Sequence, residues 1–266
     1  MALSPAIMGI VNVTPDSFFP GSRAASAAEA IERGRRFFGE GADVVDVGGE
    51  STRPGATPVA VSEELRRVLE TVSVLAREGT VSIDTQKEPV ARAAFDAGAT
   101  ILNDVSGTLA EVAGELGRDY VAMHRKGNAA DMQLDPHYDD VVVEVSDYLE
   151  DLARRARRAG VGRLWFDPGI GFGKTLEHNL ELLGALEHFV ALAARYDAEV
   201  LVGTSRKRFL EFVGAPGDAV ESRLEASLAT AAWCVLKGAS MVRVHDVAAT
   251  VALREILARP LERVGA

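Results

Sequence analysis

Eight short apolar runs recur along this chain of 266 residues, and each is followed or ended by a polar residue. Most of the runs are continuously apolar, as is typical of strands buried on both faces of a parallel sheet. When parallel strands alternate with helices and close into a barrel, their carboxyl ends meet at one rim, where distant residues can surround one ligand. The polar residues in question are Asn12, Asp46, Asp84, Asn103, His124, Asp167, Ser205 and Arg243.

The runs predict strands at Ala6 to Asn12, Asp43 to Val47, Thr80 to Asp84, Thr100 to Asn103, Tyr120 to His124, Arg163 to Asp167, Glu199 to Gly203 and Ser240 to His245. The segments between them predict helices at Ser26 to Glu40, Ser62 to Arg77, Glu88 to Ala97, Leu109 to Leu116, Val141 to Arg158, Asn179 to Arg195, Ser222 to Lys237 and Val247 to Leu257. Ser62 is a candidate N-cap, with Glu63 and Glu64 in the first turn. This alternation indicates an α/β protein with a (β/α)₈ TIM-barrel fold.

The length of the chain fits one such barrel, which normally takes about 250 residues in a single domain. We therefore expect one domain over residues 1–266. Hydrophobic residues at 47% and charged residues at 26% are typical of a soluble globular protein. A net charge of −10 argues against a general nucleic-acid-binding protein, because phosphate contacts require a basic surface.

The single cysteine and the apolar runs bear on the expected location. Cys234 stands in an apolar stretch, so we expect it in the core, with no internal disulfide and a reducing compartment. Met1 to Ile10 has no basic segment before its apolar residues, and no run approaches the ~20 residues of a membrane span. These features predict a cytoplasmic protein without a membrane partner.

Three predicted strand-to-helix connections are long or rich in glycine and proline: Thr14 to Ala24, Gly48 to Ala60 and Arg125 to Tyr138. Long connections in a compact domain usually serve as lids or binding elements. We therefore expect these three segments to border a site.

Asp84 and Asp167 both end predicted strands, and Asn103 ends a third. A lone Asp in such a place often only caps the following turn. Two carboxylates on one rim can instead accept paired hydrogen bonds from an amino-heterocyclic ligand, and an amide beside them can donate and accept. The combination suits the edge of a pterin ring.

Cations follow the last two predicted strands, in Gly203 to Arg208 and in Val242 to Asp246. Barrel enzymes frequently bind phosphate with the loops after strands seven and eight. Arg206 and Arg208 also fit a solvated basic run, whereas Arg243 and His245 lie in an otherwise apolar strand. Arg243 is therefore the stronger candidate for an anion contact.

The run Gly171 to Thr175 resembles the end of a phosphate-binding P-loop, but the first glycine of that motif would fall at Pro168. We expect its glycines to let the backbone pass close to a ligand, with Phe172 as a flat apolar wall. No cysteine and histidine spacing predicts zinc. A Mg²⁺ ion that bridges ligand phosphates needs few protein ligands, and the side-chain carbonyl of Asn12 could supply one.

Taken in order, these motifs closely resemble those of the dihydropteroate synthase family of the folate pathway. The resemblance runs nearly end to end, through Asn12 to Phe18, Asp46 to Gly55, Ser82 to Thr85, Asn103 to Gly107, Met123 to His124, Asp167 to Thr175, Ser205 to Phe209 and Arg243 to Val247.

The resemblance implies a barrel enzyme that joins 6-hydroxymethyl-7,8-dihydropterin diphosphate to 4-aminobenzoate and releases pyrophosphate and 7,8-dihydropteroate. It implies that the pterin ring is held by Asp84, Asn103, Asp167 and Lys207, and the diphosphate and Mg²⁺ by Asn12, Arg243 and His245, with Asn12 on the metal. The residues implied to frame 4-aminobenzoate are Thr52, Arg53, Pro54, Phe172, Ser205 and Lys207. The implied catalytic residues are Asn12, Asp84, Lys207 and Arg243, and the implied assembly is a homodimer, for which the helix of Ser222 to Lys237 is apolar enough.

The chain departs from the family pattern at two places. Phe18 to Ser22 carries Pro20 where an acidic residue is often found, and Arg125 and Lys126 add two positive charges after the fifth predicted strand. Solvated loop charges are the simplest interpretation of that pair. Two other functions stay open: a pterin-binding paralogue without catalysis, and a pterin-dependent methyltransferase, against which the cationic segments argue.

Overall fold

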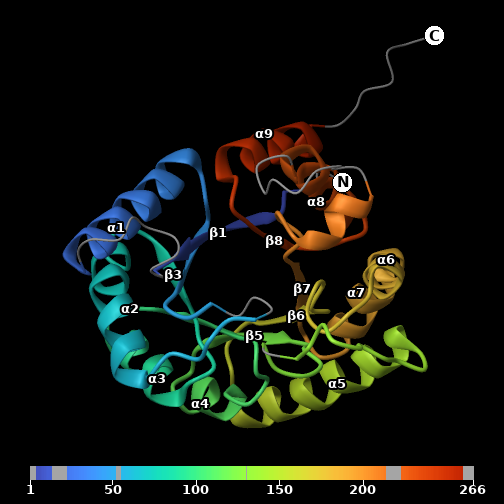
Figure 1. Ribbon diagram of the computed structural model, residues 1–266, viewed down its shortest axis with the longest axis horizontal. Coiled ribbons are helices and arrows are strands. Elements are labelled where there is room, and N and C mark those ends of the chain that lie inside the picture. Colours follow the sequence, from blue (N-terminus) through green and yellow to red (C-terminus); the bar gives the residue numbers. More distant parts are fainter. Residues whose placement is uncertain (1–3, 14–22, 52–54, 130, 214–222, 260–266) are drawn as a thin grey trace.

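The structure, a computed structural model, describes residues 4–13, 23–51, 55–129, 131–213 and 223–259. A parallel sheet closes into a barrel by pairing of β1 with β8, and helices surround it (Figure 1). Each strand lies within one residue of its predicted bounds, and the predicted (β/α)₈ fold is confirmed. The strands are β1 (Ala6–Asn12), β2 (Val44–Gly48), β3 (Thr80–Asp84), β4 (Ile101–Asp104), β5 (Asp119–Met123), β6 (Leu164–Asp167), β7 (Glu199–Val202) and β8 (Met241–Val244).

The helices of the described residues are α1 (Arg23–Glu40), α2 (Val61–Leu75), α3 (Glu88–Asp96), α4 (Ala110–Glu115), α5 (Val141–Ala159), α6 (Leu176–Gly184), α7 (Leu186–Ala194), α8 (Leu224–Leu236) and α9 (Val247–Ala258), with a short 3₁₀ helix, η2 (Arg208–Phe212). The single helix predicted from Asn179 to Arg195 is two helices that meet at Ala185, because Gly184 weakens the helix there. The N-cap prediction at Ser62 was wrong. Helix α2 begins one residue earlier, after Ala60, without a side-chain cap.

Helix α5 shows why these sequences form helices at these places. Asp140 accepts hydrogen bonds from the backbone N–H groups of Val142 and Val143, which caps the first turn. Gly160 ends the helix in the left-handed conformation, at φ 85°. Its buried residues recur at helical spacing and pack on the barrel: Val141, Val145, Leu149, Leu152 and Ala156 are among them.

The interior of the barrel changes from apolar to polar along its axis. Successive strand residues alternate between the inside and the outside of the barrel, so residues two apart share the inside. One buried apolar cluster has a member on seven of the strands: Met8, Val44, Ile101, Val121, Trp165, Leu201 and Met241. It is separate from the larger cluster between the strands and the helices. Two residues further along, four of these strands carry polar side chains: Asp46, Asn103, Asp167 and Arg243.

The apolar cluster closes the bottom of the barrel, so a ligand can reach the polar layer only from the carboxyl ends of the strands. Trp165 is 1% exposed, and its indole N–H donates to Glu199 at 3.1 Å. Complete burial of such a side chain contributes about 1.5–3 kcal/mol, provided that its N–H is hydrogen-bonded.

Two further expectations bear on the described residues. Cys234 is buried, as predicted, and burial raises the pKa of its thiol to about 12. In the part of the chain that the structure describes, no helix is both long and apolar enough to cross a membrane.

Candidate active site

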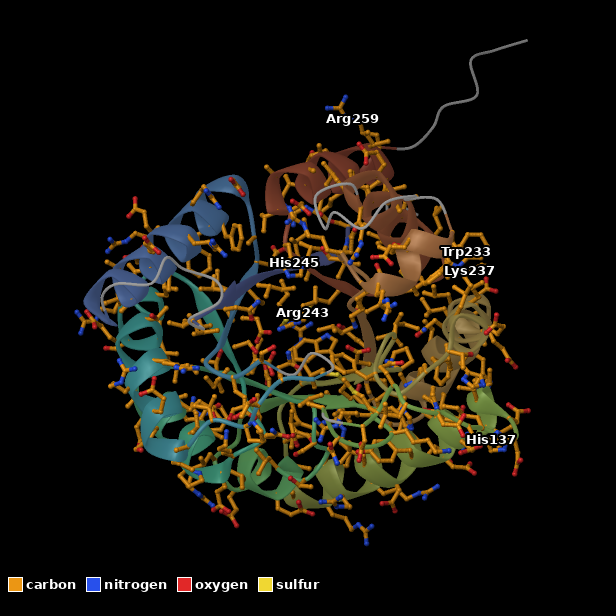
Figure 2. The ribbon with its side chains drawn as sticks, in the orientation of Figure 1. His137, Trp233, Lys237, Arg243, His245 and Arg259 are labelled. Carbon is orange, nitrogen blue, oxygen red and sulfur yellow. The ribbon has the colours of Figure 1, made fainter. Side chains whose placement is uncertain are left out.

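Arg243 binds two carboxylates at the mouth of the barrel. Its Nε donates to Asp46 Oδ2 at 2.7 Å, and its terminal N–H donates to Asp84 Oδ2 at 2.7 Å. Asn103, beside Asp84 in strand register, donates its amide to the same Asp46 oxygen at 3.0 Å. Figure 2 shows Arg243 and His245 within the ring of helices, whereas Trp233 lies at its outer edge. Strands β2, β3, β4 and β8 therefore deliver one connected polar cluster, as the sequence predicted for three of its four members.

Asp46 is the member that the prediction of site residues left out. It lies in the middle of β2 and faces inward two residues after Val44. Its side chain is completely buried and receives both Arg243 and Asn103. The sequence marked Asp46 as a polar residue in an apolar run, but Asp46 is followed by another strand residue, whereas Asp84 and Asp167 end their strands.

Two acceptor atoms of this cluster have no hydrogen-bond partner among the described residues. They are Asp46 Oδ1 and Asn103 Oδ1, and both side chains are completely buried. Buried acceptors are nearly always satisfied in folded proteins, and an unsatisfied one costs about 1–3 kcal/mol. The site is therefore built to receive a ligand that donates hydrogen bonds.

Burial shifts the acid and base properties of this cluster. It raises the pKa of Asp84 to about 7, an effect that the charge of Asp46 adds to and that of Arg243 opposes. It raises the pKa of Asp167 as well, against the charges of Lys207 and Arg243 and the backbone N–H of Gly169. The neighbouring cations oppose this effect of burial and favour the ionised carboxylates.

Arg243 keeps its own charge in this environment. Burial alone lowers its pKa, but the charges of Asp46 and Asp84 outweigh that effect, so the pKa is raised. A guanidinium held by two carboxylates is a fixed positive centre, and neither partner can leave without exposing the other charges to an apolar interior.

Lys207 and Phe172 meet on the β6 and β7 side of the mouth, as expected for a ligand wall beside a cation. The Lys207 ammonium lies 4.4 Å from the centre of the Phe172 ring and donates to the carbonyl of Ile170. Burial lowers the pKa of Lys207 to about 8, although the charge of Asp167 opposes this. Lys207 therefore binds its proton less tightly than a solvent-exposed lysine does.

Three positive-φ glycines give the β6–α6 connection its path. Gly169, Gly171 and Gly173 have φ values of 69°, 82° and 64°. A Cβ on Gly169 would lie 1.7 Å from the carbonyl oxygen of His124, so only glycine fits. The glycines bring the connection against neighbouring loops, and Gly171 also packs on Lys207. The close approach seen here is to protein, and the expected approach to a ligand stays a prediction.

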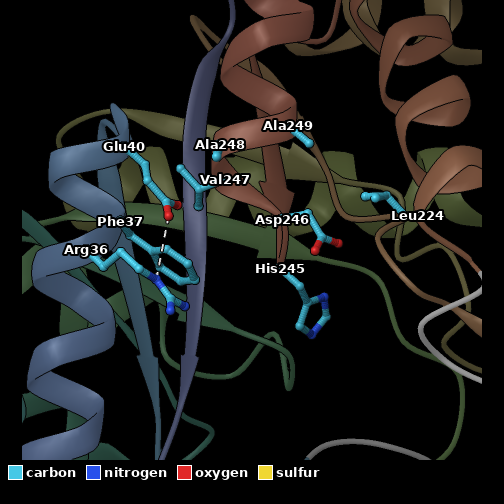
Figure 3. Close-up of a pocket in the computed structure, with 9 residues that line it drawn as sticks. All are labelled: Arg36, Phe37, Glu40, Leu224, His245, Asp246, Val247, Ala248 and Ala249. Carbon is cyan, nitrogen blue, oxygen red and sulfur yellow. Dashed lines mark ion pairs between the residues drawn. The ribbon is translucent and has the colours of Figure 1, made fainter.

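Ser205 and His245 lie together at the ends of β7 and β8. The Ser205 hydroxyl accepts from the backbone N–H of His245 at 3.1 Å and lies 3.1 Å from its Nδ1. A cavity of about 230 Å³ adjoins His245, between α1, α8 and the start of α9, with Arg36 across from it (Figure 3). His245 therefore borders this cavity as well as contacting Ser205.

The basic run after β7 is not uniformly solvated. Arg206 forms an ion pair with Asp246, through its Nε at 2.9 Å, and is only partly exposed. The solvated interpretation is therefore wrong for Arg206. It is confirmed for Arg208, whose side chain is 86% exposed and lies 3.9 Å from Glu211.

Lys126 also differs from a solvated loop charge. Its ammonium forms an ion pair with Glu144 at 3.0 Å and lies 4.1 Å from the centre of the Tyr138 ring. Arg125 is in contact with Gln86 at 3.4 Å. These bonds tie the β5–α5 connection to its surroundings.

The described ends of the β2–α2 connection are fixed by a buried network. Lys87 forms ion pairs with Glu50 and Glu64, and Glu50 also accepts from the backbone N–H of Val59 at 2.8 Å. The completely buried Glu64 accepts from the Thr85 hydroxyl at 2.6 Å. The expected 4-aminobenzoate residues Thr52, Arg53 and Pro54, and Pro20 in the first connection, lie outside the described residues.

The sequence of this chain is similar to those of known proteins over most of its length. A model of the family described as "Pterin binding enzyme" matches residues 8–245. The dihydropteroate synthase of Escherichia coli K12 is 42% identical over 93% of this chain and 88% of its own length. This chain belongs to the dihydropteroate synthase family. The family relative from Mycobacterium leprae is 43% identical over 94% of this chain and 92% of its own length.

A solved dihydropteroate synthase has the same fold. The enzyme of Xanthomonas albilineans, solved with 4-aminobenzoic acid, superposes with a TM-score of 0.86 at 41% identity, over 95% of this chain and 92% of its own. These relatives are synthases, and none of them supports the methyltransferase alternative. Membership in the dihydropteroate synthase family, predicted from the motifs, is confirmed.

Proposed function

We propose that this site joins 6-hydroxymethyl-7,8-dihydropterin diphosphate to 4-aminobenzoate and releases pyrophosphate and 7,8-dihydropteroate. The observation that carries the proposal is the pair of buried, unsatisfied acceptors, Asp46 Oδ1 and Asn103 Oδ1, beside a guanidinium held in the same cluster. The amino and ring N–H groups of a dihydropterin supply the donors that these acceptors lack. Asp84 and Asp167 add acceptors on either side of them.

The reaction breaks the C–O bond at the pterin methylene carbon, and the bonding electrons leave with the diphosphate. The amine nitrogen of 4-aminobenzoate forms the new C–N bond and then loses a proton. Negative charge grows on the leaving group and positive charge on the pterin, so fixed charges of the opposite sign at each end lower the barrier. Arg243 and His245 face the leaving group, whereas Asp84 and Asp167 stabilise the pterin.

Lys207 and Phe172 serve the second substrate in this proposal. The apolar ring supplies a flat surface for the aromatic ring of 4-aminobenzoate, and the ammonium beside it orients its electron-rich groups. Ser205 lies near enough to His245 to contribute to the same region of the mouth. Thr52, Arg53 and Pro54 complete the proposed 4-aminobenzoate contacts.

A Mg²⁺ ion bound with the diphosphate fits the donors at the mouth. The side-chain oxygens of Asn12 and Asp84 both lie beside Gly48, because a Cβ on Gly48 would be 3.6 Å from Asn12 Oδ1 and 3.7 Å from Asp84 Oδ2. Asn12 would hold the ion, and the ion would neutralise charge on the diphosphate. Mg²⁺ usually keeps several water ligands and binds substrate phosphates, so one side-chain oxygen of the protein is enough.

The assembly and the location belong to the same proposal. Trp233 and Leu236 on α8 are 47% and 60% exposed, and we propose that this face pairs with a second copy in a homodimer. The single buried cysteine supports a cytoplasmic enzyme. The net charge of −10 disfavours nucleic acid as a partner.

Pyrophosphate release tests the proposed function. Purified protein is mixed with the dihydropterin diphosphate, 4-aminobenzoate and Mg²⁺, with each component omitted in turn, and dihydropteroate is quantified in parallel. Release that requires both substrates, with one dihydropteroate formed per pyrophosphate, supports the proposal. Tight binding of the dihydropterin without release would overturn it in favour of a catalytically silent pterin-binding protein.

A further inference from the structure

Lys174 is a buried cation to which the proposed reaction gives no role. It stands at the end of the β6–α6 connection, just before the N-cap of α6, and is 3% exposed. Its ammonium donates to His124 Nδ1 at 2.9 Å and to the carbonyl of Phe172 at 3.1 Å. The charges that act on it are those of one carboxylate, Asp167, and of two cations, Lys207 and Lys126. Burying an ammonium without a direct counter-ion costs several kcal/mol, so its two acceptors must be held firmly.

The two acceptors belong to different loops of the mouth. Phe172 is in the β6–α6 connection, and its ring faces Lys207 while its carbonyl faces Lys174. His124 follows β5, is 5% exposed, and donates its backbone N–H to the carbonyl of Asp167 at 3.0 Å. Lys174 therefore joins the segment that carries the Phe172 ring to the strand end that carries Asp167.

The neighbouring contacts leave this junction little freedom to relax. Gly169 and Gly173 bring the connection so close that added Cβ atoms would lie 1.7 Å and 2.2 Å from the carbonyl oxygens of His124 and Lys126. The Tyr138 hydroxyl donates to the carbonyl of Gly173 at 2.9 Å. A shift of the Lys174 end would therefore move the backbone on either side of Phe172.

The charges around Lys174 favour a neutral His124 ring that accepts a hydrogen bond from the Lys174 ammonium. Burial lowers the pKa of His124 to about 2, and the charges of Lys174 and Lys126 lower it further, so the ring is neutral and Nδ1 can accept. Burial also lowers the pKa of Lys174, against the charge of Asp167, and the charges of Lys207 and Lys126 lower it further. In return, the charge of Lys174 lowers the pKa of Asp167.

We propose that Lys174 is a positioning residue that, through His124 and the Phe172 carbonyl, holds the 4-aminobenzoate wall in register with the pterin carboxylate Asp167. The proposal rests on the function proposed above, because it assigns the two ends of the junction to the two substrates. It goes beyond that function by giving a role to a residue that touches neither substrate. It also explains why a P-loop-like lysine occurs in a sequence that lacks a P-loop.

The test compares Lys174→Met with the wild-type enzyme and with Lys126→Met. Methionine keeps the length of the side chain and removes its charge and donors, and Lys126 offers a matched control on the neighbouring loop. We expect Lys174→Met to raise the KM for 4-aminobenzoate about fivefold or more, with a smaller change in the KM for the dihydropterin. We also expect the acid limb of kcat/KM for the dihydropterin to move to higher pH, because Asp167 loses a stabilising cation. Lys126→Met removes a nearby charge but neither of the bonds of Lys174, so it should change both readouts by much less than Lys174→Met.

A second pair of variants keeps the proposal testable if Lys174→Met does not fold. His124→Asn retains an acceptor for Lys174, whereas His124→Leu removes it. The proposal requires a raised KM for 4-aminobenzoate in His124→Leu and a KM nearer to the wild-type value in His124→Asn.

The outcomes separate this proposal from the function on which it rests. A wild-type enzyme that releases no pyrophosphate refutes the proposed function, whatever the variants do. An active wild-type enzyme with unchanged KM values and pH profiles in the folded variants overturns the role of Lys174. If Lys174→Met lowers only kcat, in proportion to the loss of folded protein, Lys174 has a purely structural role. That result also overturns the proposal.

Discussion

Arg243 combines a structural and a chemical task in one side chain. It is 17% exposed and neutralises two carboxylates from different strands, which no lysine could do with the same planar geometry. Arg243→Met should lower kcat by about 10²–10³-fold, the usual effect of removing one group that stabilises developing charge. It should also destabilise the fold by about 3–5 kcal/mol, because Asp46 and Asp84 lose their partner. Steady-state kinetics and urea unfolding measure the two effects.

Arg208→Met is the control for Arg243→Met. Arg208 is a cation in the neighbouring connection, but its side chain is 86% exposed. We expect this variant to keep the free energy of unfolding within about 0.5 kcal/mol of wild type. Near-normal turnover of a folded Arg243→Met protein would refute the assigned role at the leaving group.

Asp84 and Lys207 give the ligand-free protein a pH-dependent stability. The pKa of Asp84 rises from 3.8 to about 7 on folding, so its contribution is complete below pH 3.8 and is lost as pH rises through 7. The pKa of Lys207 falls from 10.5 to about 8, so its contribution is complete above pH 10.5 and is lost as pH falls through 8. Asp84→Asn should therefore reduce the decline in stability between pH 3.8 and 7, and Lys207→Met the decline between pH 10.5 and 8.

Urea unfolding across this pH range measures both effects. Each variant should alter the slope in its own window and leave the other window parallel to wild type. Curves that stay parallel to wild type throughout would show that neither group changes its proton affinity on folding.

The β6–α6 connection is the element whose geometry depends most on glycine. Gly169 has φ 69°, and an added Cβ would lie 1.7 Å from the His124 carbonyl oxygen, where both partners are backbone. Gly169→Ala should therefore destabilise the protein by more than the ~1 kcal/mol that a positive φ alone costs. It should also impair catalysis, since Phe172 and Asp167 flank this position. Thermal unfolding and kcat/KM give the two measurements.

Gly117→Ala separates the two causes. Gly117 has φ 59°, but nothing lies within 4 Å of its added Cβ. This variant should show the conformational cost alone, and activity close to wild type. Equal losses of stability in the two variants would show that the contact with His124 relaxes and does not dictate glycine.

At the scale of elements, the sequence predicted the strands better than their connections. Strand bounds were right to within one residue because a buried strand must be apolar until it reaches the mouth of the barrel, as Trp165 to Asp167 illustrates. The division at Gly184 was missed, since the apolar pattern continues across it. The pairing of Arg206 with Asp246 was missed because it joins residues 40 apart.

The candidate site shows the same division between local and long-range information. Asn103 and Asp84 could be predicted from their places at strand ends. The dependence of Asp46 on Arg243 joins residues 197 apart and follows from the closure of the barrel, not from a local pattern. Likewise, the bond from Lys174 to His124 arises only when two loops meet.

At the scale of the whole molecule, the barrel separates the proposed chemistry from the proposed assembly. The polar cluster lies at the carboxyl ends of the strands, whereas Trp233 and Leu236 are exposed on α8, and Figure 2 places Trp233 at the outer edge of the ring. Trp233 already donates its indole N–H to the carbonyl of Leu183 at 3.0 Å, which fixes the ring in place. A rigid aromatic side chain beside an exposed aliphatic one is typical of the centre of an interface.

Leu236→Arg should therefore shift a dimer to monomers while leaving the polar cluster intact. A buried charge without a partner at the interface costs several kcal/mol, so we expect the dissociation constant to rise by about a hundredfold or more. Sedimentation velocity over a concentration series measures it, and kcat of the monomer shows whether the two sites work independently. Val143→Arg is the matched control, because Val143 is an aliphatic residue that is 52% exposed on a different helix of the ring, α5 (Figure 1). A wild-type protein that sediments as a monomer, or a dimer that Leu236→Arg leaves intact, would place the interface elsewhere or exclude it.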